Sequence, residues 1–501
     1  MGVKSGSTTP AQAATAQTVT AQTVTVPAQV PRGEERAGTP EQLTRADRVA
    51  KGKDARTRAP LESQAEFTPN SSRDSIGLLL EQAKSRVPEL VPVRHGRMLV
   101  SPFTYYRGAA LPMAADLATT PTSGLRVQLC GDAHLSNFGG FASPSRRLVF
   151  DVNDFDETLP GPFEWDVKRL AASLAVAGRA NGFRAKDRRQ IEITAAEAYR
   201  TAMRAFADQP FMDVWYAHLN VDDAISQFRS QLKAKRAKDV KKMATKAHTS
   251  DSMKVLSKLT TDVDGHRRII SQPPLIEPIE EVFPEAQADA IYEQIREVLG
   301  KYQRTLQSDR RHLVEYFTLV QVARKVVGVG SVGTRAWIAL MEGVDGSEPL
   351  FLQAKEAQPS VLAAYCGRSK YTNQGERAVA GQLLMQAESD IFLGWTHVTG
   401  PDGVDRDFYV RQLKDWKMSL PIEQMIPSGM KVYARMCGWT LARAHARSGD
   451  RMALAAYLGN SAKFDNAIAD FAETYADQNE RDHAAFQAAA KEGKVTATNE
   501  I

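Results

Sequence analysis

The feature that most constrains the fold is a stretch of strand character, residues 319–417, in a chain whose other segments have helical periodicity. Two β-leaning runs flank GVGSVG (328–333), a helical pattern follows at 375–390, and two more β-leaning runs surround the turn TGPDGVD. Helical patterns fill 163–207, 286–307 and the C-terminal part. A β-β-α-β-β segment between helical stretches predicts an α+β fold with a small antiparallel sheet.

Composition divides the chain into four segments. Residues 1–60 are rich in Ala, Gln, Thr, Pro and charge, which predicts a disordered tail. Residues 61–310 are expected to form a mainly helical unit, 311–420 a β-rich unit, and 421–501 helices that complete the helical unit. Within 225–258 the basic run KAKRAKDVKKMATK is either a solvated helix face or a contact for an acidic or phosphate-rich partner.

Charge and cysteine content exclude several classes of protein. The 64 basic and 59 acidic residues give a net charge of only +5, so a nucleic acid partner is not expected. Cys130, Cys366 and Cys437 are widely spaced and form no CxxC pair, which argues against a disulfide framework and a structural zinc site. The sequence has no signal-peptide pattern and no apolar run of about 18 residues. We therefore expect a cytoplasmic protein without a membrane partner.

The first polar cluster is GDAHLSN, at the end of the β-leaning run LRVQL. Asp132 and Asn137 are suited to phosphoryl transfer, because an aspartate can accept the proton of the attacking hydroxyl and an asparagine oxygen can bind magnesium. The alternative is an Asx-rich turn without chemistry. His134, lacking partners for a transition-metal site, is interpreted as a loop histidine that orders the turn.

The second polar cluster is NDFDE, at the end of RLVFDV. It brings two further carboxylates, Asp154 and Asp156, to a strand end, where hard cations that bridge phosphates find oxygen ligands. Asp166, in EWDVKRLA, has two interpretations: an anchor for the catalytic loop through backbone amides, or an acid in the first turn of a helix.

The glycine-rich segment predicts a phosphate-binding turn. Gly328, Gly330, Ser331 and Gly333 form a GxGxxG pattern, but the β-leaning RAWIALMEG that follows disfavours a dinucleotide-binding fingerprint, which needs a helix there. A clamp between two strands remains, in which backbone amides approach nucleotide phosphates and a lysine on the next strand pairs with them.

Lys355, in LFLQAKEA, is the candidate for that lysine. A buried lysine needs an acid, and the helical segment that follows offers Glu376 on its first turn and Glu388 near its end, of which Glu376 has the more natural spacing. The alternative is a surface lysine with Glu356 as its partner. Arg107, Lys414 and Lys417 are candidate phosphate or substrate contacts, or exposed ion-pair partners.

These motifs resemble the aminoglycoside and choline kinase branch of the kinase-like superfamily, whose catalytic loop reads His-Gly-Asp-x-His-x-x-Asn and whose metal motif begins Asp-Phe or Asp-Trp. The resemblance implies that Asp132 is the catalytic base, that Asn137 and Asp154 bind magnesium, and that Asp166 is the aspartate of the following helix. It likewise matches the glycine segment, Lys355 and Glu376 to the phosphate clamp and its ion pair. Cys130 and Arg335 depart from the pattern, replacing a histidine and a valine.

The order of these motifs is reversed relative to an ordinary kinase, in which the glycine loop and lysine precede the catalytic loop. A circular permutation reconciles the two orders, because LARAHARSGD resembles the helix that leads into the catalytic loop. The resemblance thus implies a two-lobed kinase-like fold with a mostly helical C-lobe and a small β-sheet N-lobe. Residues 60–490 also resemble an uncharacterised bacterial family of unknown function.

We therefore expect an ATP- and Mg²⁺-dependent phosphotransferase that transfers a phosphoryl group to a hydroxyl. The expected acceptor is a small molecule, and a protein is the alternative. One alternative is a nucleotide-binding pseudokinase with a regulatory role. Another is a metal-dependent phosphohydrolase that uses Asp132, His134, Asp154 and Asp156, with the glycine segment as a plain hairpin.

Overall fold

The computed structural model describes the following residues: 43–223, 242, 244–245, 252–264, 266–283, 285–326, 328–346, 348–400, 402–413 and 416–498. From Thr44 onward they form one compact unit of α+β architecture, in which helices are supplemented by small antiparallel sheets. The basic run at 233–246 and Lys414 lie almost entirely outside these residues.

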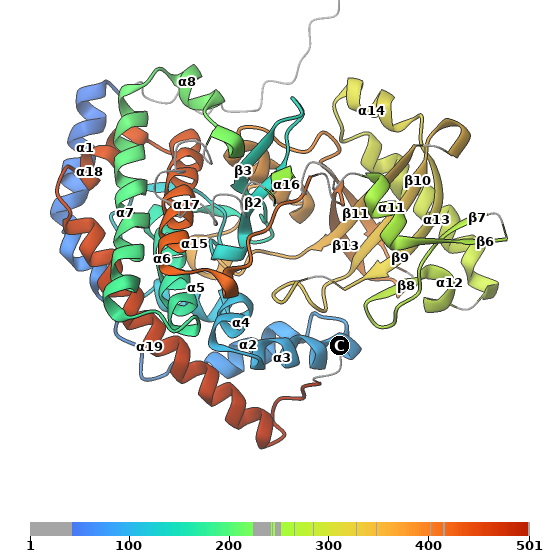
Figure 1. The fold of residues 1–501 in the computed structure, drawn as a ribbon, viewed down its shortest axis with the longest axis horizontal. Coiled ribbons are helices and arrows are strands. Elements are labelled where there is room, and N and C mark those ends of the chain that lie inside the picture. The colour runs from blue at the N-terminus through green and yellow to red at the C-terminus, as the bar shows by residue number, and fades with distance from the viewer. Residues whose placement is uncertain are drawn as a thin grey trace, which may run out of the picture. The chain divides into compact units, whose positions relative to one another are not determined.

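Two regions are distinguished by their secondary structure, helices at the left of Figure 1 and a larger sheet at the right. The helical region comprises residues 44–223 and 422–498. Its helices are α1 (Arg45–Arg58), α2 (Ser75–Ala83), α3 (Val91–Leu99), α4 (Pro102–Gly108), α5 (Ala110–Leu117), α6 (Phe163–Ala180), α7 (Ala185–Asp208), α8 (Phe211–Tyr216), α17 (Pro427–Ser448), α18 (Arg451–Leu458) and α19 (Lys463–Lys491), with short 3₁₀ turns at η1 (Leu61–Ala65), η2 (Pro88–Leu90), η3 (Leu135–Asn137) and η6 (Ile422–Gln424). Its strands are β1 (Arg126–Leu129), β2 (Phe138–Ala142), β3 (Leu148–Val152), β4 (Leu159–Pro162) and β5 (Leu219–Asn220).

The sheet region comprises residues 252–413. Its strands are β6 (Thr260–Val263), β7 (His266–Ile269), β8 (Ile276–Pro278), β9 (Thr318–Lys325), β10 (Ala336–Glu342), β11 (Pro349–Ala357), β12 (Gly394–Thr399) and β13 (Asp405–Gln412). Its helices are α11 (Ser252–Leu259), α12 (Ile279–Val282), α13 (Glu285–Gln303), α14 (Ser308–Val314), α15 (Ala363–Cys366) and α16 (Gln374–Met385), with a 3₁₀ turn η5 (Val344–Gly346).

Helix α6 is the centre of the helical region. Its sequence, FEWDVKRLAASLAVAGRA, lacks a polar face, and residues 163–178 are all buried, as expected for a helix enclosed by other helices. Small residues allow the surrounding helices to approach closely: a Cβ on Gly438 of α17 would lie 2.2 Å from the backbone oxygen of Ala195 in α7. The two short sheets, β1–β4 and β2–β3–β5, lie beside this core and present the polar loops.

The prediction of a disordered tail over 1–60 is wrong for residues 45–58, which form α1; residues 1–42 lie outside the described part. Thr44 and Asp47 form a capping box at the start of the helix. Gly52 packs so closely on α18 that a Cβ there would lie 2.1 Å from the backbone oxygen of Ala453. Small residues bury this helix face, so the shortage of large apolar side chains does not indicate disorder here.

The β-β-α-β-β pattern is confirmed in the sheet region. Six strands form an antiparallel sheet in the order β12-β13-β11-β10-β9-β8, and Lys355 in β11 pairs with Ala336 in β10 and with Tyr409 in β13. The glycine segment connects β9 to β10. The predicted boundary at residue 310 is too late, because β8 pairs with β9 and so belongs to the sheet. The helix predicted at 375–390 ends at Met385.

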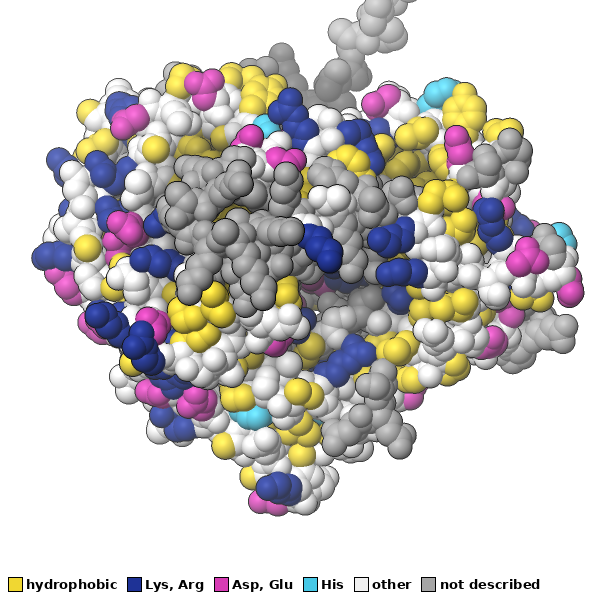
Figure 2. Space-filling model, in the orientation of Figure 1, with side chains coloured by type: hydrophobic (Ala, Val, Ile, Leu, Met, Phe, Trp, Pro, Cys, Tyr) yellow, Lys and Arg dark blue, Asp and Glu magenta, His cyan; other side chains and the backbone are white. Residues whose placement is uncertain are grey.

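The chain passes from the sheet region to the helical region after β13. Met418 exchanges two backbone hydrogen bonds, both 2.8 Å, with Gly140 of β2, which ties this connection to the helical region. Figure 2 shows Lys and Arg side chains near the middle of the visible face, between the two regions. Among the described residues, none of the helices combines the length and apolar character needed to cross a bilayer.

Candidate functional site

The loop between β1 and β2 carries the first polar cluster, and Asp166 holds it in place. The backbone N–H groups of Cys130 and Gly131 donate to the Asp166 carboxylate at 2.8 and 3.0 Å. Asp166 lies in the first turn of α6 and is 1% exposed. Both interpretations of Asp166 are therefore confirmed: it opens a helix, and it anchors the loop through backbone amides.

Gly131 is required by the shape of this loop. Its φ angle is +84°, in the left-handed region, and a Cβ would lie 2.3 Å from the backbone oxygen of Glu157. The two polar clusters therefore pack directly against each other at this glycine.

Asp132 is held by a buried arginine that sequence reasoning missed. Arg169 donates from Nε to Asp132 Oδ1 at 2.8 Å, and its Nη2 lies 2.6 Å from the same oxygen. Arg169 lies one helical turn after Asp166 on α6, and this i,i+3 spacing was the available signal. Among the described residues, Asp132 Oδ2 accepts no hydrogen bond and lies 3.6 Å from Nε2 of His134.

His134 orders the loop, as predicted. Its Nδ1 accepts a hydrogen bond from the Ser136 backbone N–H at 3.2 Å, which caps η3. Burial is the main cause that lowers the pKa of His134 to about 4, against the opposing effect of Asp132, so the ring is neutral at pH 7. Since Nδ1 is an acceptor, the proton resides on Nε2, facing Asp132.

Asn137 closes the loop on itself. Its side-chain Nδ2 donates to the backbone oxygen of Asp132 at 2.9 Å, and its own backbone oxygen accepts from Asn153. The amide nitrogen is thus committed to the protein, and the side-chain oxygen is left as a possible metal ligand.

Asp156 joins the two regions. Its carboxylate accepts hydrogen bonds from Lys355 Nζ at 2.6 Å, from the Tyr409 hydroxyl at 2.6 Å and from the Ser331 hydroxyl at 3.2 Å. Burial raises its pKa, but Lys355 and the other donors outweigh burial, so the pKa of Asp156 lies below its ordinary value. The metal role predicted for Asp156 stays a prediction; the contacts here make it the anchor of Lys355.

Asp154 lines a pocket and accepts fewer hydrogen bonds from the protein than Asp156 does. Its Oδ2 lies 4.0 Å from Lys355 Nζ, and its Oδ1 accepts only from the Asp156 backbone N–H, at 3.2 Å, among the described residues. Burial and the charge of Asp156 raise its pKa, while Lys355 and Arg411 oppose the rise. A carboxylate of raised pKa at a solvent-accessible position is one that a divalent cation would stabilise.

Lys355 is the central residue that the sheet contributes to the candidate site. Its side chain is 3% exposed, and the charges of Asp154 and Asp156 raise its pKa despite burial. The predicted pairing with Glu376 is wrong, because Asp156 from the other region takes that place; Glu376 lies at the start of α16, where its backbone N–H donates to Asn373. The same helix contributes Arg377, whose Nη2 donates to the backbone oxygen of Asp156 at 2.8 Å.

The glycine segment is fastened at both ends to the helical region. Gly328 and Gly333 have positive φ angles of 69° and 90°. Arg97 donates to the backbone oxygen of Gly328 at 2.6 Å, and the Val87 N–H donates to Gly333 at 2.8 Å. At the tip, Gly330 would bring a Cβ to 3.1 Å from the backbone oxygen of Arg107.

Arg335, which departs from the kinase pattern, stabilises the strand that leaves the glycine segment. Its backbone N–H donates to the Glu356 carboxylate at 3.0 Å, and its Nη1 lies 3.3 Å from the same oxygen. Arg335 therefore supports the local structure of β10 and β11.

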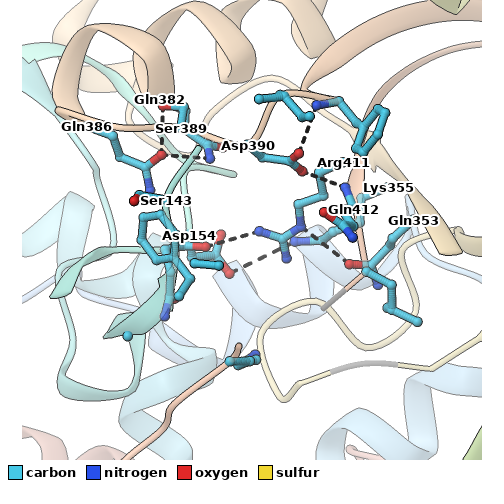
Figure 3. A pocket seen from close by; sticks show the side chains of 18 of the residues that line it. Ser143, Asp154, Gln353, Lys355, Gln382, Gln386, Ser389, Asp390, Arg411 and Gln412 are labelled. Carbon is cyan, nitrogen blue, oxygen red and sulfur yellow. Dashed lines mark hydrogen bonds and ion pairs between the residues drawn. The ribbon is translucent and has the colours of Figure 1, made fainter. Parts of the chain in front are cut away.

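Two pockets meet at these residues. The large pocket, about 780 Å³, is lined by Lys355, Gln353 and Arg411 of the sheet. Figure 3 shows Lys355 and Arg411 reaching toward Asp154. Strand alternation could have revealed Arg411, since it shares a face of β13 with Tyr409, the partner of Lys355 in the register.

The second pocket, about 580 Å³, is lined by Asp132 and His134 and by Arg86, Arg94 and Arg107, and we call it the arginine pocket. The two pockets share the following residues: Arg107, Asn137, Asp154, Gly328 and Ser331. Of the residues predicted to be the base, the metal ligands or the phosphate clamp, those that line one pocket or both are Asp132, Asn137, Asp154, Asp156, Gly328, Gly330, Ser331 and Lys355, whereas Gly333 and Glu376 line neither.

Comparison with known proteins gives a family but no activity. No curated protein and no solved structure matches the chain. A family model described as "Uncharacterized protein conserved in bacteria (DUF2252)" matches residues 86–489, a range that contains the glycine segment and both polar loops. The resemblance to an uncharacterised bacterial family is confirmed, and the chain belongs to that family.

Proposed function

We propose that this protein is an ATP- and Mg²⁺-dependent phosphotransferase with a kinase-like site. The observation that carries the proposal is the arrangement of the two pockets. Asn137 and Asp154 line both, whereas Lys355 lines only the large pocket and Asp132 only the arginine pocket. Phosphoryl transfer needs these groups in the same spatial order: a cation beside the nucleotide phosphates, metal ligands next to it, and a base beside the acceptor.

The sheet supports the kinase-like part of the proposal. In kinases the glycine-rich loop precedes a strand that carries the lysine, and a helix follows that strand. The same succession occurs here in β9, the glycine segment, β10, β11 with Lys355, and α16. The main departure is the ion pair of Lys355, which uses Asp156 in place of an acid on the helix.

The contact between α17 and β1 supports a circular permutation of a two-lobed kinase-like fold. The hydroxyl of Ser448, at the end of α17, accepts from the Gln128 backbone N–H in β1 at 3.2 Å. A helix at the C-terminal side of the sequence thus ends beside the strand that enters the Asp132 loop. Joining these two ends would restore the order that ordinary kinases have.

The residues present fit a magnesium ion bound together with nucleotide phosphates. Magnesium usually keeps several waters and takes one or two protein oxygens, and the side-chain oxygens of Asn137 and Asp154 are available for this. In the described part of the chain no group of three or more His, Cys, Asp or Glu residues forms a closed metal site. When bound, the ion would neutralise charge on the phosphates.

The chemistry of this chain's own residues then follows. Lys355 and the glycine segment bind and orient the phosphates in the large pocket. Asp132, which lines the arginine pocket, accepts the proton of the attacking hydroxyl on Oδ2, and Arg169 on Oδ1 fixes the orientation of the carboxylate. His134 does not compete with Asp132 as the base, because its neutral ring already carries a proton on Nε2, the nitrogen that faces Asp132.

One observation favours a nucleotide-binding protein without turnover as the second candidate. Arg169 occupies Asp132 Oδ1 in a buried ion pair at 2.6 Å, which leaves only one oxygen of this carboxylate to receive a proton. A hydrolase in which the glycine segment is a plain hairpin is less well supported, because Ser331 and Lys355 both contact Asp156.

The test is a titration of the full chain with Mg-ATP, followed by mass analysis of products formed with cell extract as the source of acceptor. The proposal expects magnesium-dependent ATP binding and transfer of a phosphoryl group to an acceptor. Binding without any turnover would favour the second candidate. Absence of ATP binding at millimolar nucleotide would refute both.

A further inference from the structure

Three arginines line the arginine pocket without a carboxylate partner. Arg86 is 6% exposed, Arg94 is fully buried, and Arg107 is partly buried. Among the described residues, none of the three lies within ion-pair distance of an acid, in contrast to Arg169 or Arg443, which are equally buried and paired. Buried guanidinium groups without a counter-ion are costly, so their presence around a cavity needs an explanation.

Their hydrogen bonds are incomplete. Arg94 donates from Nη2 to Gln82 Oε1 at 3.0 Å and to the Gly108 backbone oxygen at 2.8 Å, but its Nε and Nη1 have no acceptor. Arg86 donates from Nη1 to the Val332 backbone oxygen, and its Nε has no acceptor; the same holds for Nε of Arg107. Four buried nitrogen atoms of these arginines therefore have no acceptor among the described residues.

The acids of the same pocket do not cancel this charge. Of the six acids that line it, five lie within ion-pair distance of another cation: Asp132 of Arg169, Asp154 and Asp156 of Lys355, Glu356 of Arg335 and Glu81 of Lys84. The sixth, Glu157, accepts a hydrogen bond from the Val361 backbone N–H at 2.7 Å.

We propose that the arginine pocket binds the anionic group of the phosphoryl acceptor, a carboxylate or a phosphate, while the acceptor's hydroxyl faces Asp132. This inference rests on the proposed function for the identity of the acceptor. The cavity, about 580 Å³, has the size of a small-molecule site. Guanidinium groups bind carboxylate and phosphate oxygens with paired hydrogen bonds, and such an anion would supply the counter-charge that the three arginines lack.

The position of the arginines favours the acceptor over the nucleotide. Arg86 and Arg94 line only the arginine pocket, on the Asp132 side of Asn137 and Asp154, whereas Lys355 and Arg411 line only the large pocket. Arg107 lines both pockets, so it can also contact the group in transfer. The same charge disfavours polycationic acceptors such as aminoglycosides, despite the resemblance of the loop motifs to aminoglycoside kinases.

The experiment is isothermal titration of the full chain with inorganic phosphate and, separately, with Mg-ATP. It uses the wild type, Arg94→Gln, Arg86→Gln and Lys355→Met, with Arg94→Lys as the charge-conserving control. We expect phosphate affinity to fall about tenfold or more in Arg94→Gln and Arg86→Gln, and to change less than about twofold in Lys355→Met. Mg-ATP affinity should instead fall about tenfold or more in Lys355→Met and change less than about twofold in Arg94→Gln and Arg86→Gln.

A competition arm identifies the ligand class. Glucose 6-phosphate is expected to displace phosphate from the wild type, whereas glucose and kanamycin are not. Displacement by kanamycin, undiminished phosphate binding in both arginine variants, or no phosphate binding to the wild type at millimolar concentration would overturn the proposal. So would an equal loss of Mg-ATP and phosphate affinity in Arg94→Gln, because the arginines would then serve the nucleotide.

The design separates this inference from the proposed function. Failure of Mg-ATP to bind, with phosphate binding that still depends on Arg94, would refute the phosphotransferase and leave the anion site. Normal Mg-ATP binding, with phosphate binding that does not depend on the arginines, would refute the anion site and leave the proposed phosphotransferase. Circular dichroism and melting temperature establish folding, and Arg86→Gln carries the test if the fully buried Arg94 cannot be replaced.

Discussion

The two sides of the site are built differently. On the helical side, buried groups of the same region hold Asp132 and Asn137: Asp166 binds the loop backbone and Arg169 binds the carboxylate. On the sheet side, the glycine segment and Lys355 are held by groups of the other region. The loop that carries Asp132 is therefore preorganised, whereas the glycine segment and Lys355, the proposed phosphate clamp, depend on contact between the regions. If the proposed function is right, loss of that contact would weaken nucleotide binding before it displaced Asp132.

Asp132→Asn removes the proposed base and leaves the proposed phosphate clamp intact. We expect ATP consumption in the presence of an acceptor to fall about 10²- to 10⁴-fold, because a positioned base contributes that much to proton transfer. The Mg-ATP dissociation constant should stay within about twofold of wild type. Steady-state kinetics and titration measure the two quantities. A folded variant with full turnover would contradict the assignment of Asp132.

Asp166→Ala breaks the anchor on the helical side. It leaves the buried N–H groups of Cys130 and Gly131 without an acceptor, so we expect a loss of roughly 2–6 kcal/mol in the free energy of unfolding. Urea denaturation measures the loss. Asp166→Asn keeps one acceptor oxygen and should lose less. Equal stability of Asp166→Ala and wild type would show that the loop is not held by this carboxylate.

Lys355→Met tests the clamp on the sheet side. The loss of a charge-assisted contact to phosphate predicts a fall of about 10- to 100-fold in Mg-ATP affinity. Matched variants sharpen the comparison: Asp156→Asn removes the partner observed in the structure, and Glu376→Gln removes the partner expected from sequence. Titration should find weaker Mg-ATP binding in Asp156→Asn and wild-type binding in Glu376→Gln. Weaker Mg-ATP binding in Glu376→Gln together with wild-type binding in Asp156→Asn would contradict this expectation and would indicate a Lys355–Glu376 ion pair, as in kinases.

Glu157 tests the junction between the regions, with the smallest expected effect. Its pKa of about 7 in the folded protein exceeds the ordinary 4.5, because burial disfavours the charged form. The unfolded chain therefore releases this proton first as pH rises. Stability should fall between pH 4.5 and 7, by about 1–3 kcal/mol, and change no further above that range. In Glu157→Gln this part of the pH dependence should disappear from urea denaturation curves, and its persistence would assign it to another group.

The sequence predicted local features well. The strand and helix succession, the two polar loops and the role of Asp166 depend on residues within a few turns of one another, so periodicity and spacing reveal them. The helix at 45–58 was missed because Gly52 and Ala55 bury it through close backbone approach, which hydrophobicity does not register.

Long-range pairings were not accessible in the same way. Lys355 and Asp156 are far apart in the chain, and both Glu376 and Glu388 offered plausible partners at shorter range. Only the docking of β11 against the loop after β3 decides between them. The three arginines that have no ion-pair partner among the described residues were equally hidden, because a sequence shows a charge and does not show whether an acid lies within ion-pair distance of it.

The most direct test is a crystal structure of the full chain with Mg²⁺ and a non-hydrolysable ATP analogue. We predict the triphosphate in the large pocket, contacting Lys355 and the glycine segment, with the metal bound by Asn137 and Asp154 and the terminal phosphate facing the arginine pocket. A nucleotide bound elsewhere, or one whose phosphates point away from Asp154, would contradict the proposed phosphotransferase.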